Sequence, residues 1–128
     1  MKVVILAGGF GTRLSEYTKR IPKPMVKIGK IPILLHIIKY YMKYDLNDFI
    51  IAGGYKYSNI KKYFKKKKIK NANIEVVNTG LNTLTGKRLK CLEDMLTETF
   101  MLTYGDGLSN INIKKFYNFH KKNKKKIT

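Results

Sequence analysis

Four short apolar runs alternate with stretches of helical periodicity along this chain of 128 residues. The apolar runs predict strands over residues 2–7, 49–52, 73–77 and 100–104. The periodic stretches predict helices near residues 32–44, 57–66, 88–96 and 113–122. Strands and helices that alternate at this spacing build a mostly parallel sheet with helices on both faces. We therefore predict an α/β fold, and the chain length suits one domain over residues 1–128.

A glycine-rich stretch, LAGGFGTRL over residues 6–14, follows the first apolar run. Its three glycines let backbone N–H groups approach an anion without a Cβ in the way, and Arg13 adds a forked donor. The pattern is typical of a polyphosphate site. It is not the dinucleotide fingerprint, because Leu14 stands where the third glycine belongs, and no Lys-Ser/Thr pair follows as in a Walker loop. A purely structural turn between strand and helix remains the alternative.

Three of the four predicted strands end in turns that contain glycine, and ligands of open α/β sheets bind outside the carboxyl ends of the strands. Asp106 stands between two glycines after the last strand, where a carboxylate suits Mg²⁺ together with phosphate oxygens. A simple Asp-Gly turn is the alternative for Asp106. Pro22 and Pro24 predict an extended segment that holds Lys23 on a stiff arm.

The formal net charge of +19 would attract nucleic acid, anionic membranes and small anions alike. Only Arg13, Arg20 and Arg88 are arginines among the 27 basic residues, whereas base reading and bidentate phosphate binding favour arginine. Lysine tracts at 65–68 and 121–126 lie at predicted helix ends, where cations complement the helix dipole. We expect solvated lysines and no nucleic-acid partner; a polyanion-binding face or an RNA-associated basic domain is the alternative.

Cys91 is the only cysteine, which excludes an internal disulfide and a zinc site of several thiolates. We predict Cys91 as a small buried residue on the flank of a helix. His36 is expected to be partly buried and hydrogen-bonded to backbone or water. The first apolar run is too short for a signal peptide, and the longest apolar stretch is too short for a bilayer, so we expect a cytoplasmic protein without membrane association.

Four segments taken together resemble the sugar-nucleotide pyrophosphorylases: LAGGFGTRL at 6–14, IPKPMVKIGKIPIL at 21–34, TGLNTLTGKRLK at 79–90 and LTYGDGLSNINI at 102–113. The first two are shared across the sugar nucleotidyltransferase superfamily. The last two are narrower and are similar to the glucose-1-phosphate cytidylyltransferase family. The resemblance covers essentially the whole chain and implies the Rossmann-like nucleotide-diphospho-sugar transferase fold, represented here by its N-terminal, nucleotide-binding half.

The resemblance implies an enzyme that transfers CMP from CTP to glucose 1-phosphate, giving CDP-glucose and pyrophosphate, with Mg²⁺ as cofactor. It implies nucleotide-binding roles for Leu6, Ala7, Gly8, Gly9, Gly11, Thr12, Arg13, Lys23, Thr83, Arg88 and Gly105. Arg13 would act at the leaving pyrophosphate, Lys23 near the reacting phosphates, and Asp106 as the metal ligand. Thr83 and Arg88 would contact the cytosine nucleotide. One nucleotide would touch both the glycine-rich loop and Asp106, so both must lie at the same end of the molecule.

Two departures from the family pattern affect these expectations. Lys87 stands where the family usually has glycine, so its side chain would block the nucleotide loop or add a phosphate contact. The C-terminal half would contain the sugar-phosphate pocket, a second metal-binding aspartate and the strands that complete the sheet. Three alternatives follow for this chain: a fragment, a truncated gene product, or one piece of a split enzyme whose companion chain supplies this half. The resemblance also implies a homo-oligomer in the full-length family. A non-catalytic CTP- or polyanion-binding module, or a nucleotidyltransferase that uses UTP or dTTP, is the alternative.

Overall fold

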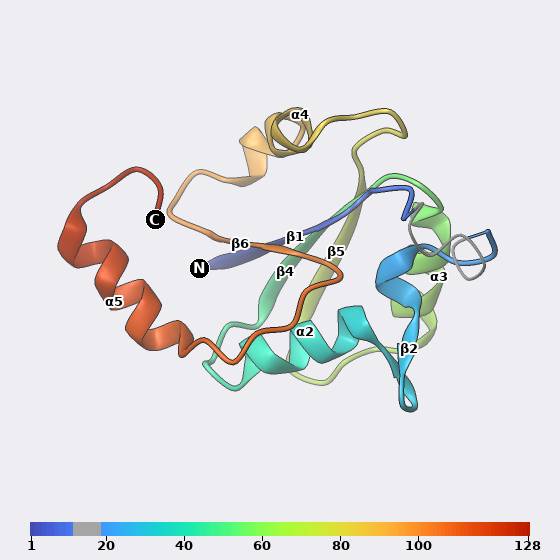
Figure 1. Cartoon of the computed structure of the whole chain (residues 1–128), viewed down its shortest axis with the longest axis horizontal. Coiled ribbons are helices and arrows are strands. Elements are labelled where there is room, and N and C mark those ends of the chain that lie inside the picture. Colours follow the sequence, from blue (N-terminus) through green and yellow to red (C-terminus); the bar gives the residue numbers. More distant parts are fainter. Residues whose placement is uncertain (12–18) are drawn as a thin grey trace.

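Four parallel strands form the central sheet of the computed structural model, which describes residues 1–11 and 19–128. Their order is β5–β4–β1–β6 (Figure 1). The strands are β1 (Lys2–Ala7), β4 (Asp48–Gly53), β5 (Asn73–Asn78) and β6 (Met101–Tyr104). On one side β1 pairs with β4, with Lys2 opposite Asp48, and on the other side it pairs with β6, with Val3 opposite Met101. The predicted parallel sheet is confirmed.

The two central strands, β1 and β4, are buried on both faces, which explains why their sequences are almost continuously apolar. Burying one such aliphatic or aromatic side chain stabilises the fold by about 1.5–3 kcal/mol. The edge strand β5 has a mixed pattern of exposed and half-buried residues instead.

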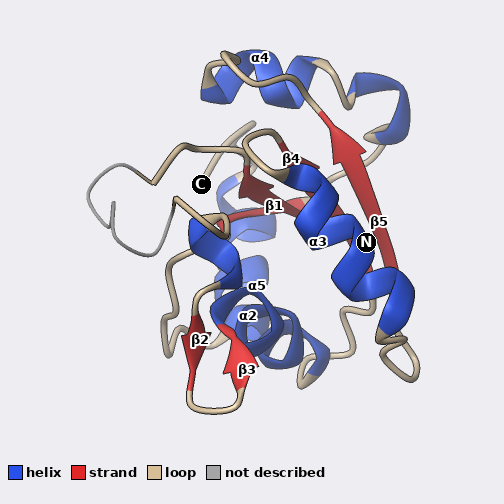
Figure 2. Ribbon diagram, turned by 90° about the vertical axis from the view of Figure 1, so that its right-hand side faces the viewer, coloured by secondary structure: helices blue, strands red, loops and turns tan. Residues whose placement is uncertain are grey.

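Helices cover both faces of the sheet, as predicted. Helices α2 (Ile33–Met42) and α3 (Tyr57–Lys66) pack on one face, against Val3, Ile5, Phe49 and Ile51. The other face is covered by the segment that contains α4 (Thr85–Lys90) and the 3₁₀ turn η3 (Glu93–Met95). Figure 2 shows α4 and α2 on opposite sides of the sheet. Helix α5 (Ile113–Asn123) contributes Ile113 to the core of the first face.

The helix predicted over residues 88–96 is wrong in its bounds. Helix α4 begins earlier, at Thr85, and ends at Lys90; η3 follows as a separate turn. Between them the backbone of Leu92 leaves the helical region (φ −110°, ψ 5°), and its side chain is fully buried against the sheet. The prediction of a buried Cys91 is also wrong, because Cys91 closes α4 on its exposed side.

The segment around Lys23 also differs from its prediction. Pro22 is extended, but Lys23 opens a 3₁₀ turn, η2 (Lys23–Met25), in which Val26 N–H donates to the Lys23 carbonyl. Pro24 fits because it occupies the first turn, where its missing N–H is not needed, and Met25 is buried beneath it. A short hairpin, β2 (Lys27–Ile28) with β3 (Ile31–Pro32), follows and was not predicted.

Other predictions agree closely with the structure. His36 on α2 is half-buried and bonds through Nε2 to the Ile28 carbonyl oxygen at 2.9 Å, which confirms its partner as backbone. The sequence also predicts a turn of helix near Ser15 and Glu16 after the glycine-rich stretch, and these positions lie outside the described residues. Among the residues that the structure describes, no helix is long and apolar enough to cross a membrane.

The strand order places a topological switch point between β1 and β6. From β1 the chain moves outward to β4 and then β5, and it returns to the other side of β1 as β6. The carboxyl ends of the neighbouring strands β1 and β6 therefore lie side by side where the direction of the strand order reverses. Ligands of open α/β sheets bind at this position.

Candidate functional site

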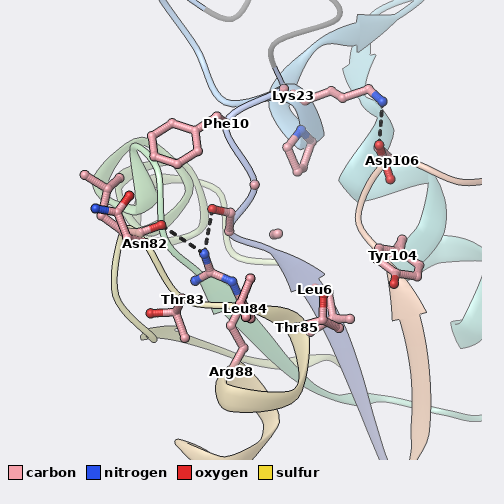
Figure 3. A pocket seen from close by; sticks show the side chains of 16 residues that line it. Leu6, Phe10, Lys23, Asn82, Thr83, Leu84, Thr85, Arg88, Tyr104 and Asp106 are labelled. Carbon is pink, nitrogen blue, oxygen red and sulfur yellow. Dashed lines mark hydrogen bonds and ion pairs between the residues drawn. The ribbon is translucent and has the colours of Figure 1, made fainter.

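A pocket of about 640 Å³ opens at the carboxyl ends of β1 and β6. Its walls come from four parts of the chain: the end of β1 with the loop after it (residues 6–11), the 3₁₀ turn η2, residues 81–85 with α4, and the end of β6 with the loop after it (Figure 3). The strand topology alone brings these parts together, since they are far apart in sequence.

Most residues singled out from the sequence lie on this pocket. Those that line it are Leu6, Ala7, Gly8, Gly9, Gly11, Lys23, Thr83, Arg88 and Asp106. Gly105 lies directly beside it, where its N–H donates to the Leu6 carbonyl oxygen at 2.9 Å. Thr12 and Arg13 lie outside the described residues. The glycine-rich loop and Asp106 are thus at the same end of the molecule, as a shared nucleotide would require.

Sequence reasoning missed several pocket residues, namely Phe10, Pro24, Leu81, Asn82, Leu84, Thr85 and Tyr104. Leu84 and Tyr104 are 82% and 59% exposed, so large apolar surfaces remain open at the pocket. Four of the seven lie in the stretch 79–90 that carries the resemblance. For Leu81 and Leu84, the sequence signal that would have identified them is an apolar side chain inside an otherwise polar loop.

Glycine is required at position 8 by the packing beneath the loop. A Cβ on Gly8 would lie 2.3 Å from Cζ of Arg88, and one on Gly54 would lie 2.6 Å from Arg88 Nη1. A Cβ on Gly9, in contrast, would meet nothing within 4 Å. Gly8 therefore serves close internal packing, whereas Gly9 leaves open space at the pocket.

Lys23 and Asp106 form an ion pair on the pocket wall, with Nζ and Oδ2 2.6 Å apart. The two side chains are 32% and 34% exposed, so water screens their attraction. The pair places a cation and a carboxylate, from η2 and from the loop after β6, at one point of the pocket wall. Both groups remain accessible to a ligand.

Arg88 is a charged residue buried at the base of the pocket, with 5% of its surface exposed. Burial lowers the pKa of its guanidinium, because removal from water disfavours the charged form. Two ion pairs occur among residues 1–11 and 19–128, and neither involves Arg88. Its partners are neutral oxygens: the Gly8, Gly53, Gly80 and Leu81 carbonyls and the Thr79 hydroxyl.

Lys87 is exposed on α4 and does not line the pocket. In the described part of the chain, no group of three or more His, Cys, Asp or Glu side chains is placed to hold a metal ion. Asp106 is therefore the carboxylate that this part of the chain offers to a cation in the pocket.

The family model described as nucleotidyl transferase matches residues 2–128. The chain belongs to the nucleotidyl transferase family. The glucose-1-phosphate cytidylyltransferase of Salmonella typhimurium (strain LT2) is 43% identical, over 100% of this chain and 59% of that protein. A probable glucose-1-phosphate cytidylyltransferase of Bacillus subtilis (strain 168) is 42% identical, over 94% of this chain and 56% of that protein.

A solved structure of HddC from Yersinia pseudotuberculosis, complexed with GMP-PN, superposes with a TM-score of 0.81. It is 30% identical, and the match covers 93% of this chain and 53% of that chain. The predicted fold of the nucleotide-diphospho-sugar transferases is thereby confirmed for this nucleotidyl transferase chain. The chain spans between about half and three fifths of the length of these relatives.

Proposed function

We propose that this chain provides the nucleotide-binding half of a glucose-1-phosphate cytidylyltransferase. A phosphate oxygen of glucose 1-phosphate would attack the α-phosphorus of CTP; the bond to the β-phosphate oxygen would break, and pyrophosphate would leave. The observation that supports this most strongly is the single pocket at the switch point, lined by both the glycine-rich loop and Asp106. The names of the two similar proteins support the choice of CTP and glucose 1-phosphate.

The residues of the pocket suit a reaction that depends on positioning and charge neutralisation. Backbone N–H groups of the glycine-rich loop, residues 6–11, would hold the phosphates, and Lys23 would neutralise charge near the reacting centre. Arg13 would stabilise the leaving pyrophosphate, with Thr12 beside it. Gly105 would lie along the nucleotide. The Thr83 hydroxyl can donate or accept, so it suits a pyrimidine edge.

Mg²⁺ belongs to this proposal, with Asp106 as its protein ligand. The donor set fits, because Mg²⁺ binds one or two carboxylates together with phosphate oxygens and retains several waters. Bound there, the cation would offset the negative charge of the triphosphate. In this structure Lys23 forms an ion pair with the Asp106 carboxylate. When a nucleotide binds, Lys23 would gain its phosphate oxygens as further partners.

The nucleotide assignment is tested by thermal unfolding with CTP, UTP, dTTP, GTP or ATP in the presence of Mg²⁺. A ligand that binds only the folded state at 100 times its Kd stabilises that state by about 2.7 kcal/mol, which raises Tm by several degrees. We expect the largest rise with CTP, and a reduced rise in Arg13→Ala. Equal rises with all five nucleotides would remove the cytidylyl assignment, and a larger rise with UTP or dTTP would favour those substrates.

A non-catalytic CTP-binding module is the second candidate. It is favoured by the observation that, among the residues that the structure describes, Asp106 is the one carboxylate that lines the pocket. Release of pyrophosphate from CTP and glucose 1-phosphate separates the two candidates. We expect little or none from these 128 residues alone, and release when a companion chain equivalent to the rest of that protein is added. The proposal of a cytidylyltransferase also includes a homo-oligomeric assembly and a cytoplasmic location.

A further inference from the structure

The buried guanidinium of Arg88 joins the loop after β1 to the loop after β5 at the pocket (Figure 3), and it also reaches the end of β4. Nη2 donates to the carbonyl oxygen of Gly8, in the loop after β1, at 3.0 Å. Nη1 lies 3.4 Å from the carbonyl oxygen of Gly53, at the end of β4. In the loop after β5, Nη1 donates to the Gly80 carbonyl oxygen at 2.7 Å, and Nη2 to the Leu81 carbonyl oxygen at 3.2 Å.

These contacts use all the hydrogens on the two terminal nitrogens. Each terminal nitrogen of a guanidinium carries two hydrogens. Nη1 faces three acceptors, including the Thr79 hydroxyl at 2.8 Å, and Nη2 faces two. Four hydrogens therefore serve five acceptors, and neither terminal nitrogen keeps one for a ligand while the loops hold this arrangement.

The bond to Gly8 also sets the direction of the next N–H. In a trans peptide, the C=O of one residue and the N–H of the following residue point in opposite directions. The structure has no cis peptide bonds among the described residues. The Gly8 carbonyl faces Arg88 and also accepts from Tyr55 N–H at 3.2 Å, so the Gly9 N–H points away from the guanidinium. Gly9 lines the pocket, and its own Cβ position is empty.

We propose that Arg88 is a positioning residue, which directs the Gly9 N–H as an anion donor by holding the Gly8 carbonyl from behind. It fixes the end of β4 and the loop after β5 in the same way, so that the pocket walls keep their spacing. The proposal differs from the direct contact with the cytosine nucleotide that the family resemblance implies. It rests on the proposed function in one respect, since the anion is taken to be the phosphate chain of a nucleotide.

The test compares the dissociation constants of CTP and UTP for the wild-type chain, Arg88→Lys and Arg88→Ala. A positioning role predicts that both nucleotides bind about tenfold more weakly or worse, because the phosphate donor is misaligned for each, while the CTP:UTP ratio is unchanged. A collapse of the ratio towards one would overturn the proposal in favour of base contact. A lower Tm with unchanged nucleotide affinity would overturn it in favour of a purely structural role.

Lys87→Ala is the matched control, because Lys87 is the exposed neighbour on α4 and does not line the pocket. It should leave both dissociation constants unchanged. Selective CTP binding by the wild-type chain tests the proposed function separately: if that binding is absent, both proposals fail, whereas loss of selectivity in Arg88→Lys removes only this one.

Amide NMR signals, measured without ligand, test the proposal even if Arg88→Ala does not fold. In Arg88→Lys labelled with ¹⁵N, we expect the amide signals of Gly9, Gly54 and Leu81 to move, because each follows a carbonyl that Arg88 binds. In Lys87→Ala these signals should stay in place. Unmoved signals in Arg88→Lys would contradict the proposal.

Discussion

Asp106 and Lys23 are held together by an ion pair that contributes little to the stability of the fold. Each side chain keeps about a third of its surface exposed, and pairs of this kind are worth about 0–1 kcal/mol. The two residues lie 83 positions apart in sequence and meet only at the pocket. The meeting of a cation and a carboxylate at this point of the pocket is therefore better explained by ligand binding than by a contribution to the stability of the fold.

At this scale, Asp106→Asn separates metal binding from stability. Without ligand we expect the Tm to change by the equivalent of no more than about 1 kcal/mol. With CTP, the additional rise in Tm caused by Mg²⁺ should disappear, because an amide is a poor replacement for a carboxylate at a hard cation. Glu93→Gln is the control, since it breaks the exposed Lys90–Glu93 pair away from the pocket. A full Mg²⁺ effect in Asp106→Asn would exclude this residue as the ligand.

Among the elements, α4 carries part of one wall of the pocket, and α4 together with η3 covers the second face of the sheet. Leu92, between them, is the fully buried side chain that fastens this segment to Val4, Leu6, Ile50 and Ala52. Cys91, one position earlier, is exposed. The break after Lys90 lets Leu92 reach the sheet, and it turns Cys91 outward at the same time.

Leu92→Ala should lower the free energy of unfolding by about 2–5 kcal/mol, because it leaves a cavity under this segment. Cys91→Ser should stay within about 0.5 kcal/mol of the wild type. Urea unfolding of both variants gives the comparison. The native Cys91 thiol should also react with a disulfide reagent without prior unfolding. Labelling that requires denaturation would contradict the exposed position of Cys91.

In the molecule as a whole, most of the positive charge lies away from the pocket. Lys23 and Arg88 are the basic residues that line the pocket in the described part of the chain. Many of the remaining lysines are exposed, including the run from Lys65 to Lys68 at the end of α3. The net charge of +19 therefore attracts anions in general rather than selecting a nucleotide.

Replacing Lys65, Lys66, Lys67 and Lys68 with glutamine tests this separation of charge and site. The rise in Tm with CTP and Mg²⁺ should be nearly intact, because the pocket is unchanged. Any salt-sensitive retention on immobilised RNA should become weaker. If this variant alone lost nucleotide binding, the pocket would be the wrong site.

The sheet ends in two edge strands, β5 and β6, and the β6 edge lies at the pocket. Of the strands in the described residues, only β1 pairs with β6, and Leu102 and Tyr104 remain exposed next to Val4 and Leu6. The unpaired edge of β6 thus lies beside exposed apolar side chains. Such an edge is open to pairing with a further strand, which fits the greater length of the relatives.

The sequence by itself determined the class of fold, the four strands and the end of the sheet that carries the site. Continuous apolar runs identified β1 and β4, and glycines after the strands marked the ligand-binding end, because both signals are local and follow from backbone geometry. Only the tertiary structure decided the strand order, the exposure of Cys91 and the partners of Arg88. Each of these depends on packing between segments far apart in the chain, as with Arg88 and Gly8, 80 positions apart. No local periodicity encodes such a contact, since its energy exists only after the sheet has brought both segments together.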